Sequence, residues 1–123
     1  MSGDHIRLTM PCSPHHARVA RTAVAACGVV ERFSVDELGD VRLLVDEVFV
    51  TMYELGVVRV ELLVVADRGR LGLAITSIGA VGERRGPAES TFVQTLADIV
   101  GTDVRFDLDP AAPSFAAVLH AAG

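Results

Sequence analysis

The stretch that decides the fold is Ser34–Leu55, which reads SVDELGDVRLLVDEVFVTMYEL. Its first four residues form a capping box, in which the Ser34 hydroxyl accepts from the Glu37 amide and the Glu37 carboxylate reaches back. Apolar residues then recur every three or four positions, as on one buried helix face: Leu38, Val41, Val45, Val48, Met52 and Leu55. The pattern predicts a long amphipathic helix that packs against a core and stops at Gly56.

The residues before this helix predict a strand and another helix. Residues 6–10 alternate apolar and polar side chains, as a half-buried strand does. Ser13-Pro14 is typical of a helix start, with serine as the cap and proline at the first helical position. Apolar residues at helical spacing follow from Ala17, and Gly28 is expected to end this helix.

The residues after Gly56 predict a hairpin, a loop, a third helix and two further strands. In chain order these elements are strands Val57–Ala66 and Arg70–Ile78 joined by Asp67-Arg68-Gly69, the loop Ser77–Pro87, a helix at Ser90–Val100, and strands Val104–Leu108 and Phe115–Leu119. This order predicts an α/β protein of the α+β type, a two-layer sandwich with a mostly antiparallel sheet and helices on one face.

The composition fits one globular domain over residues 1–123 and disfavours several kinds of function. Half of the residues are hydrophobic and 22% are charged, as in folded domains. The net charge of −5 disfavours direct nucleic-acid binding, which needs a concentrated basic surface. No secretion signal and no bilayer-spanning apolar run are visible, so we expect a cytoplasmic protein without a membrane partner.

Metal binding is not expected from the cysteines or histidines. Cys12 and Cys27 fit no zinc-binding spacing and are interpreted as small buried side chains. His15-His16 and His120 are too isolated in the sequence to form a metal site, and we expect them to be solvated.

Residues Asp36–Val48 resemble the second helix of the bacterial anti-sigma-factor serine kinases, a family of the histidine-kinase, gyrase and Hsp90 type of ATPase. The predicted order of elements is similar, and so are the strand at Leu8–Met10 and the Ala-Arg-rich helix around Ala20–Ala26. The resemblance covers nearly the whole chain but is distinctive only in the second helix. It implies a Bergerat-type fold.

In that family the second helix carries an acidic residue and, four positions later, an asparagine. Residues at this spacing share a helix face, so the carboxylate can activate a hydroxyl while the amide oxygen holds Mg²⁺. The resemblance places Glu47 at the acidic position and Thr51 at the asparagine position. A threonine hydroxyl is a weaker magnesium ligand, which disfavours the binding of ATP with Mg²⁺.

Two further nucleotide-binding motifs of the family are also altered. The Asp-x-Gly-x-Gly motif that reads adenine corresponds to residues 77–82, where Ser77 replaces the aspartate, Gly79 is kept, and Gly82 matches the second glycine after a one-residue shift. The glycine-rich lid corresponds to residues 83–90, where Pro87 removes an amide donor. Arg84 and Arg85 in this stretch could attract an anion, but we expect them to be solvated.

The resemblance therefore implies a degenerate member of the family, with no cofactor expected and Glu47 catalytic only in an active enzyme. It implies a homodimer that binds a sigma factor, a STAS-type anti-anti-sigma factor, or both. In the family an arginine matching Arg21 contacts these partners, and Arg18 lies one turn earlier; an ordinary solvated helix face is the other interpretation.

Two other functions remain open from the sequence. The chain could be an active ATP-dependent serine kinase that phosphorylates a STAS-type antagonist, which Glu47 favours and Thr51, Ser77 and Pro87 oppose. Alternatively, the altered pocket could bind a different small ligand, for which no residue provides a chemical identity.

Overall fold

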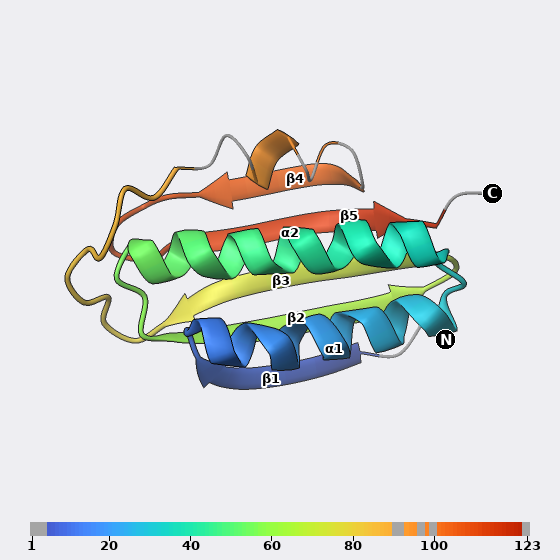
Figure 1. Cartoon of the computed structure of the whole chain (residues 1–123), viewed down its shortest axis with the longest axis horizontal. Coiled ribbons are helices and arrows are strands. Elements are labelled where there is room, and N and C mark those ends of the chain that lie inside the picture. Colours follow the sequence, from blue (N-terminus) through green and yellow to red (C-terminus); the bar gives the residue numbers. More distant parts are fainter. Residues whose placement is uncertain (1–4, 90–92, 96–97, 99–100, 122–123) are drawn as a thin grey trace.

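The structure is a computed structural model that describes residues 5–89, 93–95, 98 and 101–121. Two long helices lie side by side on one face of a five-stranded antiparallel sheet (Figure 1). The elements are β1 (His5–Pro11), α1 (Pro14–Val30), α2 (Val35–Glu54), β2 (Arg59–Asp67), β3 (Arg70–Ile78), β4 (Gly101–Asp107) and β5 (Ser114–His120). The predicted α+β sandwich with its helices on one face is confirmed.

The strand order across the sheet is β1-β2-β3-β5-β4, and every neighbouring pair is antiparallel. The β2–β3 hairpin is confirmed, but its turn is one residue shorter than predicted, because Asp67 belongs to β2 and pairs with Arg70. The two turn residues, Arg68 and Gly69, both have positive φ, of 52° and 76°. β4 begins at Gly101, three residues before the predicted Val104. Its pairing with β5 includes Gly101 and Thr102, which lie on the far side of a register shift between Thr102 and Arg105.

The capping box at the start of α2 is confirmed. The Glu37 amide donates to the Ser34 hydroxyl at 3.1 Å, and the Ser34 amide donates to the Glu37 carboxylate at 2.7 Å. The predicted apolar stripe is buried: Val41, Val45, Val48 and Met52 are all at most 1% exposed. This stripe packs on the inward side chains of the sheet, which include Leu62, Leu73, Ile75, Phe115 and Leu119.

The prediction that Gly28 ends α1 is wrong, since the helix continues to Val30. Gly28 is instead a position within α1 where Leu38 of α2 packs against the helix backbone. A β-carbon at Gly28 would lie 2.6 Å from Cδ2 of Leu38, too short for any real contact. The chain turns after Val30, where Arg32 adopts a φ of 64° and the Phe33 amide donates to the Gly28 carbonyl at 2.9 Å.

The third predicted helix is only partly within the described residues. Val93, Gln94, Thr95 and Asp98 are helical, as predicted, and Val93 is buried. The apolar positions Phe92, Leu96, Ile99 and Val100 lie outside the described residues. Among the described helices, none is long and apolar enough to cross a membrane.

Candidate functional site

Thr51, which the sequence resemblance predicts to replace a magnesium-binding asparagine, faces the interior. Its side chain is 4% exposed, and its hydroxyl donates to the backbone carbonyl of Glu47 at 2.8 Å. This bond to the preceding helical turn is a common arrangement for threonine within a helix. The hydroxyl is therefore held against the helix backbone and is not presented to a ligand.

Glu47 is half-buried and lies beside residues predicted for a different role. It lines a shallow cavity of about 310 Å³ between α1 and α2, together with Pro14, Ala17, Arg21, Asp46, Phe49 and Val50. Within this cavity, Nη1 of Arg21 donates to Oδ1 of Asp46 in a salt bridge. The structure thus brings Arg21 close to the acidic pair Asp46-Glu47 and holds it to α2, whereas Arg18 is exposed.

The residues predicted to correspond to an adenine-binding motif run from Ser77 in β3 into the loop that follows it. The Ser77 amide donates to the Pro113 carbonyl at 3.0 Å, while Gly79 is exposed with a φ of 72°. The Gly82 amide donates to the Gly56 carbonyl at 2.8 Å. None of the four cavities considered, all within the described residues, is lined by Thr51 or by these three residues.

The loop that corresponds to the nucleotide lid folds back onto the end of α2. The Arg85 and Gly86 amides both donate to the Glu54 carbonyl, at 2.7 and 3.2 Å. The Arg85 guanidinium donates to the carbonyls of Tyr53 and Val57, at 2.8 and 3.1 Å. It also lies 4.2 Å from the centre of the Tyr53 ring. Arg85 therefore caps α2 with a positive charge where the helix dipole favours one.

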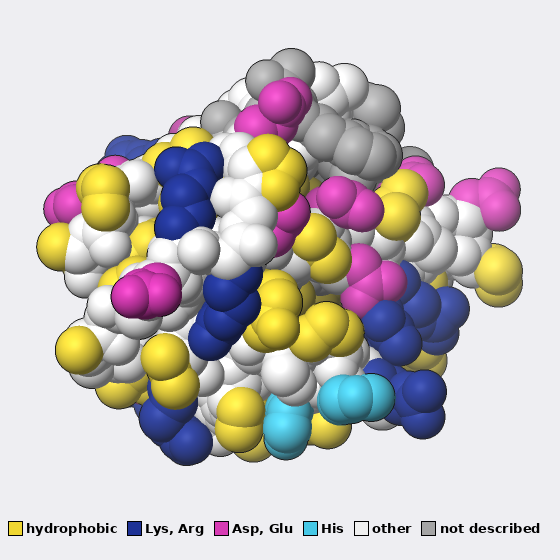
Figure 2. Space-filling model, turned by 60° about the vertical axis from the view of Figure 1, so that its left-hand side comes forward, with side chains coloured by type: hydrophobic (Ala, Val, Ile, Leu, Met, Phe, Trp, Pro, Cys, Tyr) yellow, Lys and Arg dark blue, Asp and Glu magenta, His cyan; other side chains and the backbone are white. Residues whose placement is uncertain are grey.

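Arg84 and Arg85 are exposed, as expected, but their guanidinium groups are also held to backbone carbonyls. The Arg84 guanidinium donates to the carbonyls of Gly86, Pro87 and Ala88, at 2.8 to 3.1 Å. Both guanidinium groups therefore have part of their N–H donors engaged by backbone carbonyls of the chain itself. Around this end of the molecule, basic, acidic and hydrophobic side chains are interspersed (Figure 2).

Gly56 makes the close approach of this loop possible. Its φ is 97°, and a β-carbon at this position would lie 2.4 Å from the Gly82 carbonyl oxygen and 2.6 Å from that of Glu83. The sequence predicts Gly56 as a helix stop. The structure adds that no other residue leaves room for the loop to cover the end of α2.

A second feature, which the sequence analysis missed, is the apolar face of the sheet that points away from the helices. Its centre is a shallow hollow of about 460 Å³, lined on this face by Leu63, Val65, Gly72, Ala74, Ala116 and Val118. Asp103 and Arg105 of β4 line its edge. Antiparallel sheets with one solvated face usually carry polar residues there. In the sequence, this apolar face is indicated by two unbroken apolar runs, Leu62–Ala66 and Phe115–Leu119.

Within the described residues, no group of three or more His, Cys, Asp or Glu side chains is placed to hold a metal ion. Comparison with models of known protein families finds no match to this chain, and comparison with characterised proteins finds no similar sequence.

Cys12 is buried against α2, and the ionisation of its thiol makes stability depend on pH. It is 3% exposed, its amide donates to the Val58 carbonyl, and its thiol to the Phe49 carbonyl. Burial raises the pKa of the Cys12 thiol to about 11, and the nearby positive charge of Arg85 opposes part of that rise. The folded protein therefore retains the thiol proton in a range where the unfolded chain loses it.

We expect the contribution of Cys12 to stability to be constant below pH 9 and to decline between pH 9 and about 11. The full decline corresponds to about 2–3 kcal/mol in the free energy of unfolding. Urea unfolding of the wild type and of Cys12→Ala across this range measures it. The difference in stability between the two proteins should shrink as the pH rises; a constant difference would contradict the prediction.

Proposed function

We propose that this protein is a non-catalytic regulator of the anti-sigma-factor type, which acts by binding a sigma factor or a STAS-type anti-anti-sigma factor. Two features support it. Asp36–Val48 is similar in sequence to the second helix of that family, and two adjacent helices cover one face of an antiparallel sheet. The proposal includes a Bergerat-type fold whose nucleotide site has been lost.

The non-catalytic part of the proposal rests on the burial of Thr51 and on the contacts that hold the lid-like loop to α2. Phosphoryl transfer depends on a metal ion and on groups arranged around the phosphates. Thr51 is buried with its hydroxyl on a helix carbonyl, and the lid-like loop is fastened to the end of α2 by Arg85. Neither arrangement favours the binding of ATP with Mg²⁺, so the proposed regulator uses no cofactor.

Calorimetric titration with ATP and Mg²⁺ separates this proposal from the active-kinase alternative. We expect no heat of binding for the wild type, because Thr51 offers no accessible metal ligand. Glu47→Ala should then be indistinguishable from the wild type in the same titration. Micromolar binding that Glu47→Ala abolishes would establish the kinase alternative.

The proposed partner-binding surface is the outer side of the two helices. The Arg21–Asp46 salt bridge joins α1 to α2 there, with both side chains about one third exposed. On α2, Leu43 is 42% exposed and Val50 is 43% exposed. Arg18 on α1 is exposed and, unlike Arg21, has no side-chain partner among the described residues. A cation beside exposed apolar side chains is a common arrangement in protein interfaces.

Purification of the tagged protein from its native cells, followed by mass spectrometry, tests this surface. We expect a sigma factor or a STAS-type antagonist to be recovered with the wild type. Arg18→Glu should reduce the recovery by about tenfold, since a reversed charge opposes an acidic partner. Arg59→Glu, which makes the same charge change on an exposed strand residue, is the matched control. Recovery of neither class of partner would refute the proposal.

The homodimer is a separate part of the proposal, and the apolar outer face of the sheet supports it. Leu63 and Val65 of β2 lie beside the small residues Gly72, Ala74 and Ala116. A two-fold axis places the larger side chains of one copy in the hollow of the other. Both edges of this face carry both signs of charge, which makes the face self-complementary.

The charges at the two edges come from different strands. On the β1–β2 side, Arg7 and Glu61 form a salt bridge with a 3.6 Å separation. On the β4 side, Asp103 and Arg105 line the hollow. In a face-to-face dimer the charges at each edge of one copy can pair with opposite charges of the other copy. Such pairs would fix the relative orientation of the two copies across an otherwise apolar interface.

Sedimentation analysis at micromolar concentration tests the dimer. We expect a dimeric wild type and a monomeric Ala74→Arg variant, because a long cation in the hollow blocks the facing sheet. Val35→Arg, at a helix position that is 83% exposed, adds the same charge and should remain dimeric. A monomeric wild type, or a dimeric Ala74→Arg variant, would exclude this interface.

A further inference from the structure

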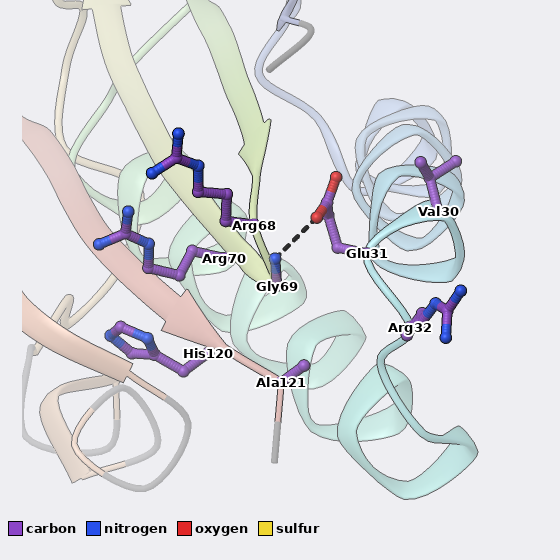
Figure 3. A pocket seen from close by; sticks show the side chains of 8 residues that line it. All are labelled: Val30, Glu31, Arg32, Arg68, Gly69, Arg70, His120 and Ala121. Atoms are coloured by element: carbon purple, nitrogen blue, oxygen red, sulfur yellow. Dashed lines mark hydrogen bonds between the residues drawn. The ribbon is translucent and has the colours of Figure 1, made fainter. Parts of the chain in front are cut away.

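A cavity of about 460 Å³ lies at the end of the molecule opposite the loop that caps α2. Three chain segments meet there: the end of α1, the β2–β3 turn and the end of β5 (Figures 1 and 3). Its lining residues are Val30, Glu31, Arg32, Arg68, Gly69, Arg70, His120 and Ala121. None of them lines the cavity between α1 and α2 or the hollow on the outer face of the sheet.

Two backbone contacts at Gly69 hold these three segments together. The Gly69 amide donates to the Glu31 carboxylate at 2.8 Å, which attaches the turn to the end of α1. The Ala121 amide donates to the Gly69 carbonyl at 2.8 Å, which attaches the end of β5 to the same turn. The turn therefore presents its side chains from a fixed position.

Three cationic or potentially cationic side chains extend from this turn and its neighbouring strand. Arg68, Arg70 and His120 extend to the same side, whereas Arg32 extends away from them (Figure 3). Arg70 and His120 are direct cross-strand neighbours in the register of β3 and β5. Two arginines thus lie together on one side of the cavity, on a chain whose net charge is −5.

The two turn arginines are available to a ligand. Arg70 has no hydrogen-bond or ion-pair partner among the described side chains, and Arg68 has only a 3.9 Å contact from its Nε to Asp67. Arg68 also occupies a turn position, with a φ of 52°, where glycine or asparagine is the relaxed choice. An arginine there costs backbone strain, and strained residues concentrate at functional sites.

We propose that this cavity binds a small phosphate ester. Arg68 and Arg70 are suited to the phosphoryl oxygens, since guanidinium groups pair with such oxygens through two parallel hydrogen bonds. His120 is the cross-strand neighbour of Arg70, and Ala121 follows it directly after β5 as an apolar contact for the organic part. The lining of this site shares no residue with the cavity between α1 and α2 or with the hollow of the sheet, on which the proposed function depends.

Calorimetric titration of the full chain with phenyl phosphate, inorganic phosphate and sulfate tests the proposal. We expect phenyl phosphate to bind more tightly than inorganic phosphate because of the apolar contacts. Arg70→Ala and Arg68→Asn should each weaken binding by about tenfold. Asparagine suits the turn backbone, so Arg68→Asn removes the guanidinium without threatening the fold.

Arg42→Ala, which removes an exposed arginine from α2, is the matched control and should bind as the wild type does. No binding of phenyl phosphate would overturn the proposal. Equal affinity for sulfate and phenyl phosphate would also overturn it, since the cavity would then attract any anion. Binding that Arg68→Asn and Arg70→Ala leave unchanged would place the ligand elsewhere.

Discussion

The carbonyl groups at the end of α2 are the constraint around which one end of this protein is built. The last turn of a helix leaves carbonyls without partners inside the helix, and burial makes such groups costly. Some partners are backbone amides just after the helix, those of Leu55, Gly56 and Val57. The lid-like loop supplies the others: the Arg85 guanidinium donates to the Tyr53 carbonyl, and the Arg85 and Gly86 amides donate to the Glu54 carbonyl. The loop is thereby committed to the helix, and Gly56 provides the space for it.

The contacts that hold this loop to α2 also limit its ability to bind phosphate. A loop that must open and close over phosphates needs free amide donors and basic side chains. In this protein the amides of Arg85 and Gly86, and the guanidinium groups of Arg84 and Arg85, already bind protein carbonyls. Thr51 is similarly occupied. These occupied groups favour a function at the protein surface over one in a nucleotide pocket.

Three such surfaces lie on different sides of the fold. The outer side of α1 and α2 combines Arg18 and the Arg21–Asp46 salt bridge with exposed apolar residues. The outer face of the sheet is apolar with a charged edge, and the β2–β3 turn carries the arginines of the proposed phosphate-ester site. Because no cavity residue is shared between the turn and the sheet hollow, variants at one leave the lining of the other intact.

The sequence by itself determined the features that depend on neighbours a few residues apart. The capping box at Ser34, the stripe of α2, the β2–β3 turn and the layer arrangement follow from local hydrogen bonding and periodicity. Local spacing also placed Glu47 and Thr51 one helical turn apart. It could not show that Thr51 is buried, that Gly28 lies inside α1, or that the outer sheet face is uncovered.

Those features were decided only by the tertiary structure, because each joins segments distant in the chain. Gly28 leaves the room within α1 into which Leu38 of α2 packs. The salt bridge of Arg21 spans 25 positions, the Arg85 cap 32, and the contact between Glu31 and Gly69 spans 38. A local residue pattern does not show which distant carbonyl or carboxylate an arginine or amide will contact. Those contacts depend on how the two helices pack on the sheet.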